Sequence, residues 1–227
     1  MSELIVRWLG IRDYAEALAA MQAFTAARTP ATADEIWLLE HPPVYTVGVR
    51  GHANAPDAIG DIPLVRTDRG GLITYHGPGQ LIAYTLIDLA RKRISVRDLV
   101  SALESAAVDL LGQYGIQAYP RSDAPGVYVE GAKIASLGIR VKKYLSYHGL
   151  SLNVDLDPTP FQAIDPCGFR GLEMTRLADL GAQVKVHEAA VPLLASLMAQ
   201  LGFEQVDRTT HELPKSLFQN SIYRTSL

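Results

Sequence analysis

The sequence of 227 residues contains a single cysteine and no feature of a cross-linked or low-complexity architecture. One cysteine, Cys167, cannot form an internal disulfide bond or supply a cluster of zinc thiolates. Apolar residues make up 48% of the chain and charged residues 20%, a balance that excludes wholesale disorder and collagen-like repeats. The length therefore predicts a globular protein with one or two domains.

The chain also lacks a strong charge of either sign and lacks long apolar runs. Lys and Arg total 21 against 24 Asp and Glu, so the net charge of −3 gives no indication of general nucleic-acid binding. The longest apolar stretch, residues 189–199, is interrupted by Pro192 and is too short to cross a bilayer. Glu3 and Arg7 make residues 1–10 unlike a targeting segment. We therefore expect a cytoplasmic protein with neither a nucleic-acid nor a membrane partner.

Hydrophobic periodicity predicts a mixture of helices and strands. Ser95 and Asp98 form a capping box before an apolar stripe, and Gly115 is suited to a left-handed helix end. Helices are expected over residues 13–28, 96–114, 175–180 and 187–201. Strands are expected over residues 35–41, 44–48, 64–67, 72–75, 81–88, 127–130, 133–141 and 147–155. With no repeat or linker, this order predicts one α+β domain over residues 1–227, in which residues 203–227 form an unassigned tail.

The densest local signal is the glycine-rich block at residues 69–80, Arg-Gly-Gly-Leu-Ile-Thr-Tyr-His-Gly-Pro-Gly-Gln. Four glycines let a backbone pass close to an extended ligand. The block is not a phosphate-binding loop, because no Gly-Lys-Ser/Thr follows, and the segment after Gly79 resembles a strand more than a helix. Taken alone, it also fits two tight turns around a short strand, with His76 as a structural histidine.

Two polar residues interrupt apolar faces of neighbouring predicted strands. Alternation places Lys133 on one face with Ala135, Leu137, Ile139 and Val141, and places His148 with Leu150, Leu152 and Val154. A buried ammonium is costly unless it is paired or deprotonated, so this pattern favours a pocket. The alternatives are a lysine that reaches water from the start of its strand and a hydrogen-bonded core histidine.

Cys167 lies between Pro166 and Gly168, in a predicted loop. A lone cysteine is usually an inert, buried, small apolar residue. A loop position outside any apolar stripe weakens that interpretation, because nucleophiles tend to lie on loops. A nearby ammonium lowers the pKa of a thiol from its free value of about 8.5, and Lys133 is the candidate. The sequence alone does not bring these two residues together.

These blocks, in this order, resemble the bacterial octanoyltransferases of lipoate biosynthesis. The resemblance runs from about Glu40 to Gly181. It is carried by His-Pro-Pro-Val-Tyr-Thr at 41–46, the block at 69–80, Lys-Ile-Ala-Ser-Leu-Gly at 133–138, His-Gly at 148–149 with Leu-Asn at 152–153, and Pro-Cys-Gly at 166–168. It implies the fold of the lipoate and biotin protein ligases, a mixed β-sheet with flanking helices.

The resemblance also implies an acyl-enzyme mechanism. Cys167 would take the octanoyl group from octanoyl-acyl carrier protein and pass it to a lysine of a lipoyl domain, and Lys133 would lower the thiol pKa and transfer protons. The implied acceptors are the lipoyl domains of 2-oxoacid dehydrogenase complexes and the glycine cleavage H protein. Because a thioester is already activated, neither a cofactor nor a metal is expected.

By the same resemblance, three segments are expected to bind the acyl chain, and His148 is a possible accessory residue. The expected binding residues are Arg69, Gly70, Gly71, Leu72, Ile73, Thr74, Tyr75, His76, Ser136, Leu137, Gly138, Gly149, Leu150 and Ser151. His76 or Lys133 could deprotonate the acceptor lysine. Acidic partners would dock on a basic surface, either residues 91–93 with Arg97 or Arg140 with Lys142 and Lys143.

Other functions remain open on the sequence alone. An ATP-dependent lipoate or biotin ligase shares the fold and the pocket lysine, but it needs no nucleophilic cysteine. A cysteine hydrolase would pair Cys167 with His76 or His148. A binding module without catalysis would bind the carrier protein without acyl transfer.

Overall fold

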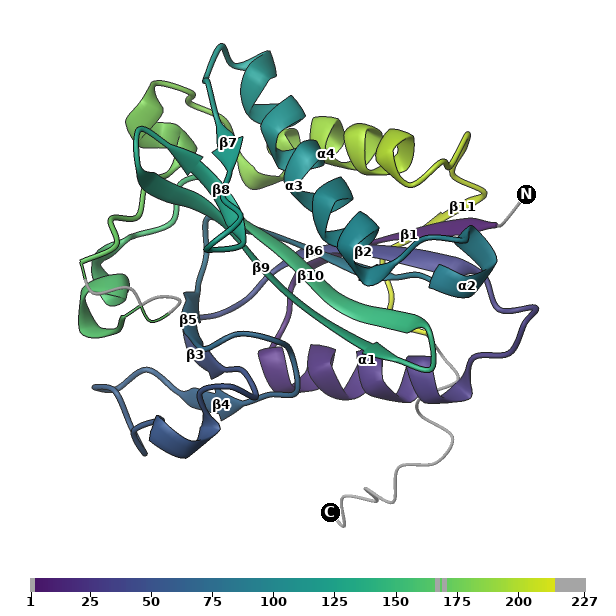
Figure 1. Cartoon of the computed structure of the whole chain (residues 1–227), viewed down its shortest axis with the longest axis horizontal. Coiled ribbons are helices and arrows are strands. Elements are labelled where there is room, and N and C mark those ends of the chain that lie inside the picture. Colours follow the sequence, from purple (N-terminus) through teal and green to yellow (C-terminus); the bar gives the residue numbers. More distant parts are fainter. Residues whose placement is uncertain (1–2, 166–167, 169–170, 215–227) are drawn as a thin grey trace.

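The computed structural model describes residues 3–165, 168 and 171–214 of the chain. Its backbone forms two β-sheets and four α-helices (Figure 1). The helices are α1 (Tyr14–Ala27), α2 (Leu89–Lys92), α3 (Val96–Gln113) and α4 (Val186–Gln200), with 3₁₀ turns η1 (His52–Asn54), η2 (Thr159–Ala163) and η4 (Leu177–Leu180). This mixture confirms the α+β fold class expected from the sequence.

The larger sheet is mixed and has eight strands in the order β11-β1-β2-β6-β10-β9-β8-β7. Strand β1 is parallel to β11 and β2, and the other neighbours are antiparallel. The strands are β1 (Leu4–Ile11), β2 (Asp34–Glu40), β6 (Gln80–Leu86), β7 (Tyr119–Pro120), β8 (Gly126–Val129), β9 (Ala132–Lys142), β10 (Leu145–Asn153) and β11 (Arg208–Thr210). The smaller sheet has the order β4-β3-β5, with β3 (Val44–Val47), β4 (Leu64–Arg66) and β5 (Ile73–His76).

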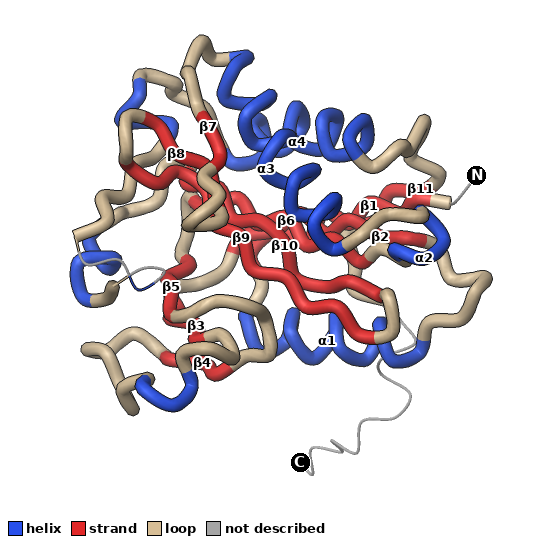
Figure 2. The backbone as a smooth tube through the Cα atoms, viewed as in Figure 1, coloured by secondary structure: helices blue, strands red, loops and turns tan. Residues whose placement is uncertain are grey.

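Helices cover both faces of the larger sheet (Figure 2). The main core lies under α3 and α4, where Leu103 and Leu193 pack with sheet residues such as Ile36 and Leu150. A second core lies under α1, where Met21 and Phe24 pack with Trp37. The smaller sheet lies on the same side of the larger sheet as α1 (Figure 1), and its residues Tyr45 and Tyr75 pack in a separate small core with Phe161.

The capping signals predict helix α3 almost to the residue. Ser95 and Asp98 make the expected capping box, and Gly115 follows the helix with a φ of 72°. Strands β9 and β10, which were expected to be neighbours, pair as a hairpin in which Lys143 and Tyr144 form a two-residue turn of positive φ.

Several elements were absent from the sequence expectation, among them β1, β7, β11 and the short helix α2. No element was expected over residues 4–11, which form β1, and residues 203–227 had no assignment. The structure shows Arg208–Thr210 paired with β1 as strand β11, and it places Leu213 in the core under α1. Among the described residues, no helix is both long enough and apolar enough to cross a membrane.

Candidate functional site

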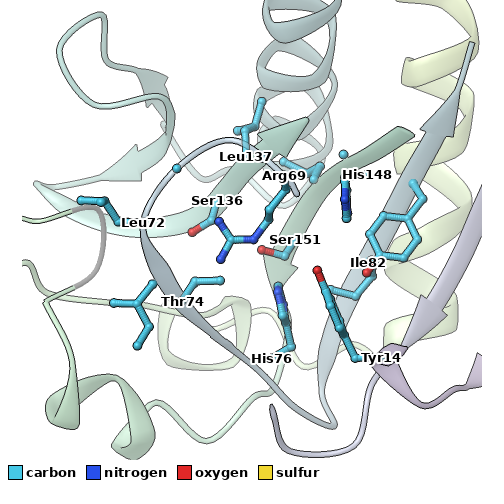
Figure 3. A pocket seen from close by; sticks show the side chains of 16 residues that line it. Tyr14, Arg69, Leu72, Thr74, His76, Ile82, Ser136, Leu137, His148 and Ser151 are labelled. Atoms are coloured by element: carbon cyan, nitrogen blue, oxygen red, sulfur yellow. The ribbon is translucent and has the colours of Figure 1, made fainter. Parts of the chain in front are cut away.

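A pocket lies between the smaller sheet and the α1 face of the larger sheet (Figure 3). Strands β5, β6, β9 and β10 contribute to its walls, together with the loop that precedes β5 and the first turn of α1. The lining residues are Tyr14, Arg69, Gly71, Leu72, Ile73, Thr74, His76, Ile82, Tyr84, Ser136, Leu137, Gly138, His148, Gly149, Leu150 and Ser151.

The floor of the pocket is made of small residues that lie opposite one another on two strands. Gly138 of β9 pairs with Gly149 of β10, and Ser136 pairs with Ser151. On the next strand, β6, the larger residues Tyr84 and Ile82 pair with Gly149 and Ser151 respectively. Small side chains on β9 and β10 beside large ones on β6 leave a narrow slot along the sheet.

Close backbone contacts hold the loop with Arg69, Gly70 and Gly71 over this slot. The Gly70 amide donates to the Ile139 carbonyl at 3.0 Å, which fixes the loop on β9. A Cβ on Gly138 would lie 3.0 Å from Arg69 Cδ, so glycine lets the arginine approach the sheet. The glycine block is therefore the roof of the pocket and not merely a pair of turns.

Arg69 extends its guanidinium into the pocket (Figure 3) and is only 8% exposed. Its Nη2 donates to the Thr46 carbonyl at 2.7 Å and to Thr46 Oγ1 at 2.8 Å. Its Nη1 donates to the Gly70 carbonyl at 2.9 Å. These bonds, to β3 of the smaller sheet and to the loop before β5, fix a positive charge within the slot.

His76 is held neutral with a defined tautomer. Gln80 donates its amide hydrogens to Asn153 Oδ1 and to the Tyr75 carbonyl, so Gln80 Oε1 accepts from His76 Nδ1 at 2.7 Å. His76 Nε2 then accepts from Thr46 Oγ1 at 3.3 Å. Burial lowers the pKa of His76 well below its usual value. Both ring nitrogens are engaged, which fits the structural alternative for this histidine.

His148 donates its Nε2 hydrogen to Asp68 Oδ1 at 2.9 Å. Asp68 also accepts from the Tyr147 hydroxyl and from Gln22 Nε2. Burial alone would raise the pKa of the Asp68 carboxyl, but the hydrogen bonds from His148, Tyr147 and Gln22 keep it below its usual value. Burial lowers the pKa of His148 more than Asp68 raises it, so this pair is a hydrogen bond between a neutral imidazole and a carboxylate.

The prediction that His148 lies on the same face of its strand as Leu150, Leu152 and Val154 is wrong. Leu150, Leu152 and Val154 pack in the main core, whereas the His148 ring stacks on Tyr147 with centroids 5.1 Å apart and lies on the pocket side. The physical reason is a left-handed backbone at His148, with a φ of 62°, which breaks the alternation of the strand. Consecutive side chains therefore reach the same carboxylate.

Lys133 is fully buried, at 0% exposure, which excludes the alternative in which it reaches water. Its Nζ donates to the Pro125 carbonyl at 2.8 Å and lies 5.4 Å from the centroid of the Tyr128 ring. Gly126 makes room for it, because a Cβ there would lie 2.4 Å from Lys133 Cε. The lysine is thus enclosed by strand β8 and the turn before it.

The strict alternation used to place Lys133 with Ala135 also fails. Lys133 pairs with Tyr128 and Ala135 pairs with Val127, so Ile134 is an extra residue in β9, a β-bulge. Ile134 and Ala135 consequently both pack in the main core.

Lys133 and His148 lie on adjoining strands but do not share the pocket. His148 pairs with Ile139, six positions (139 − 133) beyond Lys133, or roughly 20 Å of extended strand. Lys133 is not among the described residues that line the slot.

The predicted nucleophile, Cys167, lies outside the described residues. Gly168, which follows it in the chain, has a φ of 77°, and a Cβ there would lie 2.8 Å from Leu72 Cδ1. Lys133 is bonded to a later part of the same segment, since its amide donates to the Glu173 carbonyl at 2.8 Å and its carbonyl accepts from Thr175 at 3.0 Å. The described residues around Cys167 thus connect the mouth of the slot with Lys133.

Two of the residues expected to bind the acyl chain do not line the pocket. Tyr75 alternates to the other face of β5 and packs with Tyr45 and Phe161, and Gly70 is bonded to β9 through its backbone. The other expected binding residues do line it.

Sequence reasoning missed Tyr14, Ile82 and Tyr84 as lining residues. Each was assigned to an apolar helix or strand, and the hydrophobic periodicity of a helix or a strand does not distinguish a core position from the wall of a pocket. No group of three or more His, Asp or Glu side chains in the described part of the chain is arranged to hold a metal ion.

Comparison with known proteins gives the family. The model of the lipoyl protein ligase A/B catalytic domain matches residues 13–198. An octanoyltransferase of Methylococcus capsulatus is 56% identical over 203 residues, covering 89% of this chain and 98% of the relative. An octanoyltransferase of Marinobacter nauticus is 52% identical over 208 residues, covering 92% and 98%.

Solved structures give the same fold at low identity. A crystal structure of lipoate-protein ligase A bound with ATP aligns with a TM-score of 0.77 at 17% identity, covering 96% of this chain and 92% of that one. Biotin protein ligase from Aquifex aeolicus aligns with a TM-score of 0.51 at 12% identity, covering 87% and 69%. The resemblance and the ligase-like fold expected from the sequence are both confirmed. The chain therefore belongs to the lipoyl protein ligase A/B catalytic-domain family and, within it, to the octanoyltransferases, which are acyltransferases.

Proposed function

We propose that the whole chain, acting as one catalytic domain, transfers an octanoyl group from octanoyl-acyl carrier protein to the ε-amine of a lysine in a lipoyl domain. The acceptors are the lipoyl domains of 2-oxoacid dehydrogenase complexes and the glycine cleavage H protein. The observation that carries this proposal is the slot with a glycine and serine floor, whose mouth at Leu72 adjoins the residue after Cys167.

In the first step, the Cys167 thiolate attacks the carbonyl carbon of the donor thioester. A new carbon–sulfur bond forms on Cys167, and the bond to the carrier-protein sulfur breaks. The leaving thiolate takes a proton from the Lys133 ammonium. The products are octanoyl-Cys167, the free thiol of the carrier protein and neutral Lys133.

In the second step, the neutral amine of the acceptor lysine attacks the octanoyl-Cys167 thioester. A carbon–nitrogen bond forms, the carbon–sulfur bond breaks, and Cys167 leaves as its thiolate. Neutral Lys133 takes up the proton that the amine loses, which restores the starting state. His76 is less suited to this role, because both of its ring nitrogens already make hydrogen bonds.

The slot suits a saturated chain of medium length. Each buried methylene contributes about 0.8 kcal/mol, so the chain of an octanoyl group contributes roughly 5 kcal/mol to binding. Gly138, Gly149, Ser136 and Ser151 leave room for it along the sheet. Arg69, at the centre of the slot, is held in place by hydrogen bonds to the Thr46 and Gly70 carbonyls.

The test is transfer to a purified lipoyl domain, followed by the mass of that domain. With octanoyl-acyl carrier protein and no ATP, we expect one octanoyl group per lipoyl domain, and we expect none with the Cys167→Ser variant. If octanoylation instead requires free octanoate and ATP, the protein is an ATP-dependent lipoate-protein ligase.

We infer that the turn of the β9–β10 hairpin docks the acidic protein partners. Of the two basic clusters considered from the sequence, the one at residues 91–93 with Arg97 is used in part within the fold, and only Arg93 and Arg97 of it are exposed. Arg91 Nη2 donates to the buried Asp34 at 2.6 Å, and Lys92 Nζ lies 3.3 Å from the centroid of the Phe203 ring. At the hairpin, Arg140, Lys142 and Lys143 are all exposed.

Replacing Lys142 by glutamate is expected to raise the apparent KM for octanoyl-acyl carrier protein several-fold at low salt, because attraction of exposed charges assists docking. The difference from the unmodified protein should shrink as salt is added. Arg208→Glu, an exposed charge reversal on β11, is the matched control. Equal KM values for both variants and the unmodified protein would show that the hairpin is the wrong surface.

A further inference from the structure

The end of the slot away from Leu72 is formed by Ile82 and by aromatic residues. Figure 3 shows Leu72 on one side of the pocket and His148, Ile82 and Tyr14 on the other. Because Leu72 adjoins the glycine that follows Cys167, an acyl chain held on Cys167 would direct its methyl end toward His148. This end is called the inner end below.

The inner end contains a hydrogen-bond acceptor whose lone pair is not used by any described residue. Asp68 is ionised and can only accept, so the hydrogen of the His148–Asp68 bond is on Nε2. His148 Nδ1 therefore carries a lone pair. His148 is only 1% exposed, and its Nδ1 is buried with no partner among the residues that the structure describes. A buried acceptor without a donor is unfavourable and calls for an explanation.

The position of this acceptor is fixed from several sides. The His148 ring stacks on Tyr147 and meets the Tyr84 ring edge to face, with centroids 6.0 Å apart. Its backbone has a φ of 62°, which is strained for a residue with a side chain. Without that strain, alternation would turn the imidazole toward the main core. Strain of this kind at a pocket indicates that the orientation serves a function.

The nearby hydroxyls also present acceptor oxygens. Tyr14 donates its hydrogen to Thr67 Oγ1 at 3.2 Å. His41 Nδ1 lies 2.7 Å from the Arg12 carbonyl and must donate to it, so His41 Nε2 accepts the Tyr84 hydrogen at 2.7 Å. The Tyr14 oxygen already accepts from Arg69, so the acceptors that remain at the inner end are the Tyr84 oxygen and His148 Nδ1, and these suit a donor and not another acceptor.

We propose that the inner end of the slot is a subsite for an O–H donor, and that His148 Nδ1 accepts its hydrogen bond. The donor is the terminal hydroxyl of an ω-hydroxyacyl chain, or a water molecule when the chain ends in a methyl group. This inference rests on the proposed function, since it assigns the acyl group held on Cys167. It makes His148 a residue that determines specificity at the far end of the chain.

The subsite also limits the length of apolar chains. A chain one methylene longer than the slot accommodates would displace the donor and leave His148 Nδ1 buried without a partner. Sites built for a hydroxyl reject the analogue that lacks it, because their own polar groups are then unpaired. A hydroxyl in place of that extra methyl group would instead satisfy the imidazole.

The test compares two isosteric substrates, nonanoyl- and ω-hydroxyoctanoyl-acyl carrier protein, with octanoyl-acyl carrier protein as the reference. For the full-length protein we expect kcat/KM for the hydroxylated chain to exceed that for the nonanoyl chain by about tenfold. The His148→Phe variant, which has no acceptor, should prefer the nonanoyl chain. The His148→Asn variant, whose amide oxygen replaces Nδ1 as an acceptor, should again prefer the hydroxylated chain. Each ratio is measured within one protein, so a lower folded fraction does not affect it.

Calorimetric binding of free nonanoate and ω-hydroxyoctanoate to the unmodified protein gives a second readout that needs no turnover. Tighter binding of the hydroxylated acid supports the subsite, and tighter binding of nonanoate overturns it. Normal octanoyl transfer with a preference for the nonanoyl chain would refute the subsite alone. Absence of octanoyl transfer would refute the proposed function, and the binding comparison would still decide the subsite.

Discussion

Replacing Lys133 by methionine is expected to slow octanoyl transfer by about 100- to 10,000-fold, because no ammonium would remain to supply and take up the proton. The lysine is enclosed and held by the Pro125 carbonyl and the face of the Tyr128 ring. Methionine has a similar length and is apolar, so the free energy of unfolding is expected to change by no more than about 2 kcal/mol.

The rate of alkylation of Cys167 as a function of pH measures the effect of Lys133 on the pKa of the thiol, independently of turnover. In the unmodified protein, an ammonium beside the thiol should lower the thiol pKa, so that iodoacetamide reacts well below pH 8.5, roughly the pKa of a free thiol. Lys133→Met should move the midpoint of reactivity up to that value or beyond. Lys92→Met, at a lysine that contacts Phe203 and Gly202, is the matched control and should leave the profile unchanged. An unchanged profile in Lys133→Met would remove Lys133 from the mechanism.

Acidification between pH 6.5 and 4 is expected to destabilise the fold by several kcal/mol, because three buried histidines must remain neutral. Burial lowers the pKa of His41 to about 4, and it also lowers the pKa values of His76 and His148. The unfolded chain, with histidine pKa values near 6.5, binds more protons than the folded chain in this range. Stability is therefore fully present above about pH 6.5 and is lost as the pH falls.

The contribution of His41 alone is about 3 kcal/mol, at about 1.4 kcal/mol for each pH unit. Urea unfolding at several pH values measures the slope. His41→Asn keeps a donor for the Arg12 carbonyl but cannot be protonated, so its stability should depend less steeply on pH. The exposed His187→Gln is the control and should keep the original slope. A slope unaffected by His41→Asn would show that His41 is protonated in the folded protein.

Local patterns predicted those parts of the fold that local physics determines. The capping box of α3 and the glycine that follows the helix are each encoded within a few residues, and the apolar stripe lies within the helix itself. Strand β11 could not be found in this way, because residues 208–210 become a strand only by pairing with β1, about 200 residues earlier in the chain.

The sequence predicted most of the residues that line the site, but not how their side chains are arranged in space. Resemblance to a family identified the glycine-rich roof and the small-residue floor. Period-two alternation failed at Ile134, where β9 has a bulge, and at His148, where the backbone is left-handed. Both irregularities adjoin residues proposed to act on the acyl group. Departures from the regular alternation of a strand are expected at functional positions, where a side chain must point in a direction that the regular backbone does not allow.

The intermediate on Cys167 is the central claim, and intact mass after brief exposure to octanoyl-acyl carrier protein tests it most directly. The account predicts one octanoyl adduct on the unmodified protein, its absence in Cys167→Ser, and its loss when lipoyl domain is added. An adduct that persists in Cys167→Ser, or octanoylated lipoyl domain formed by Cys167→Ser at the normal rate, would contradict it.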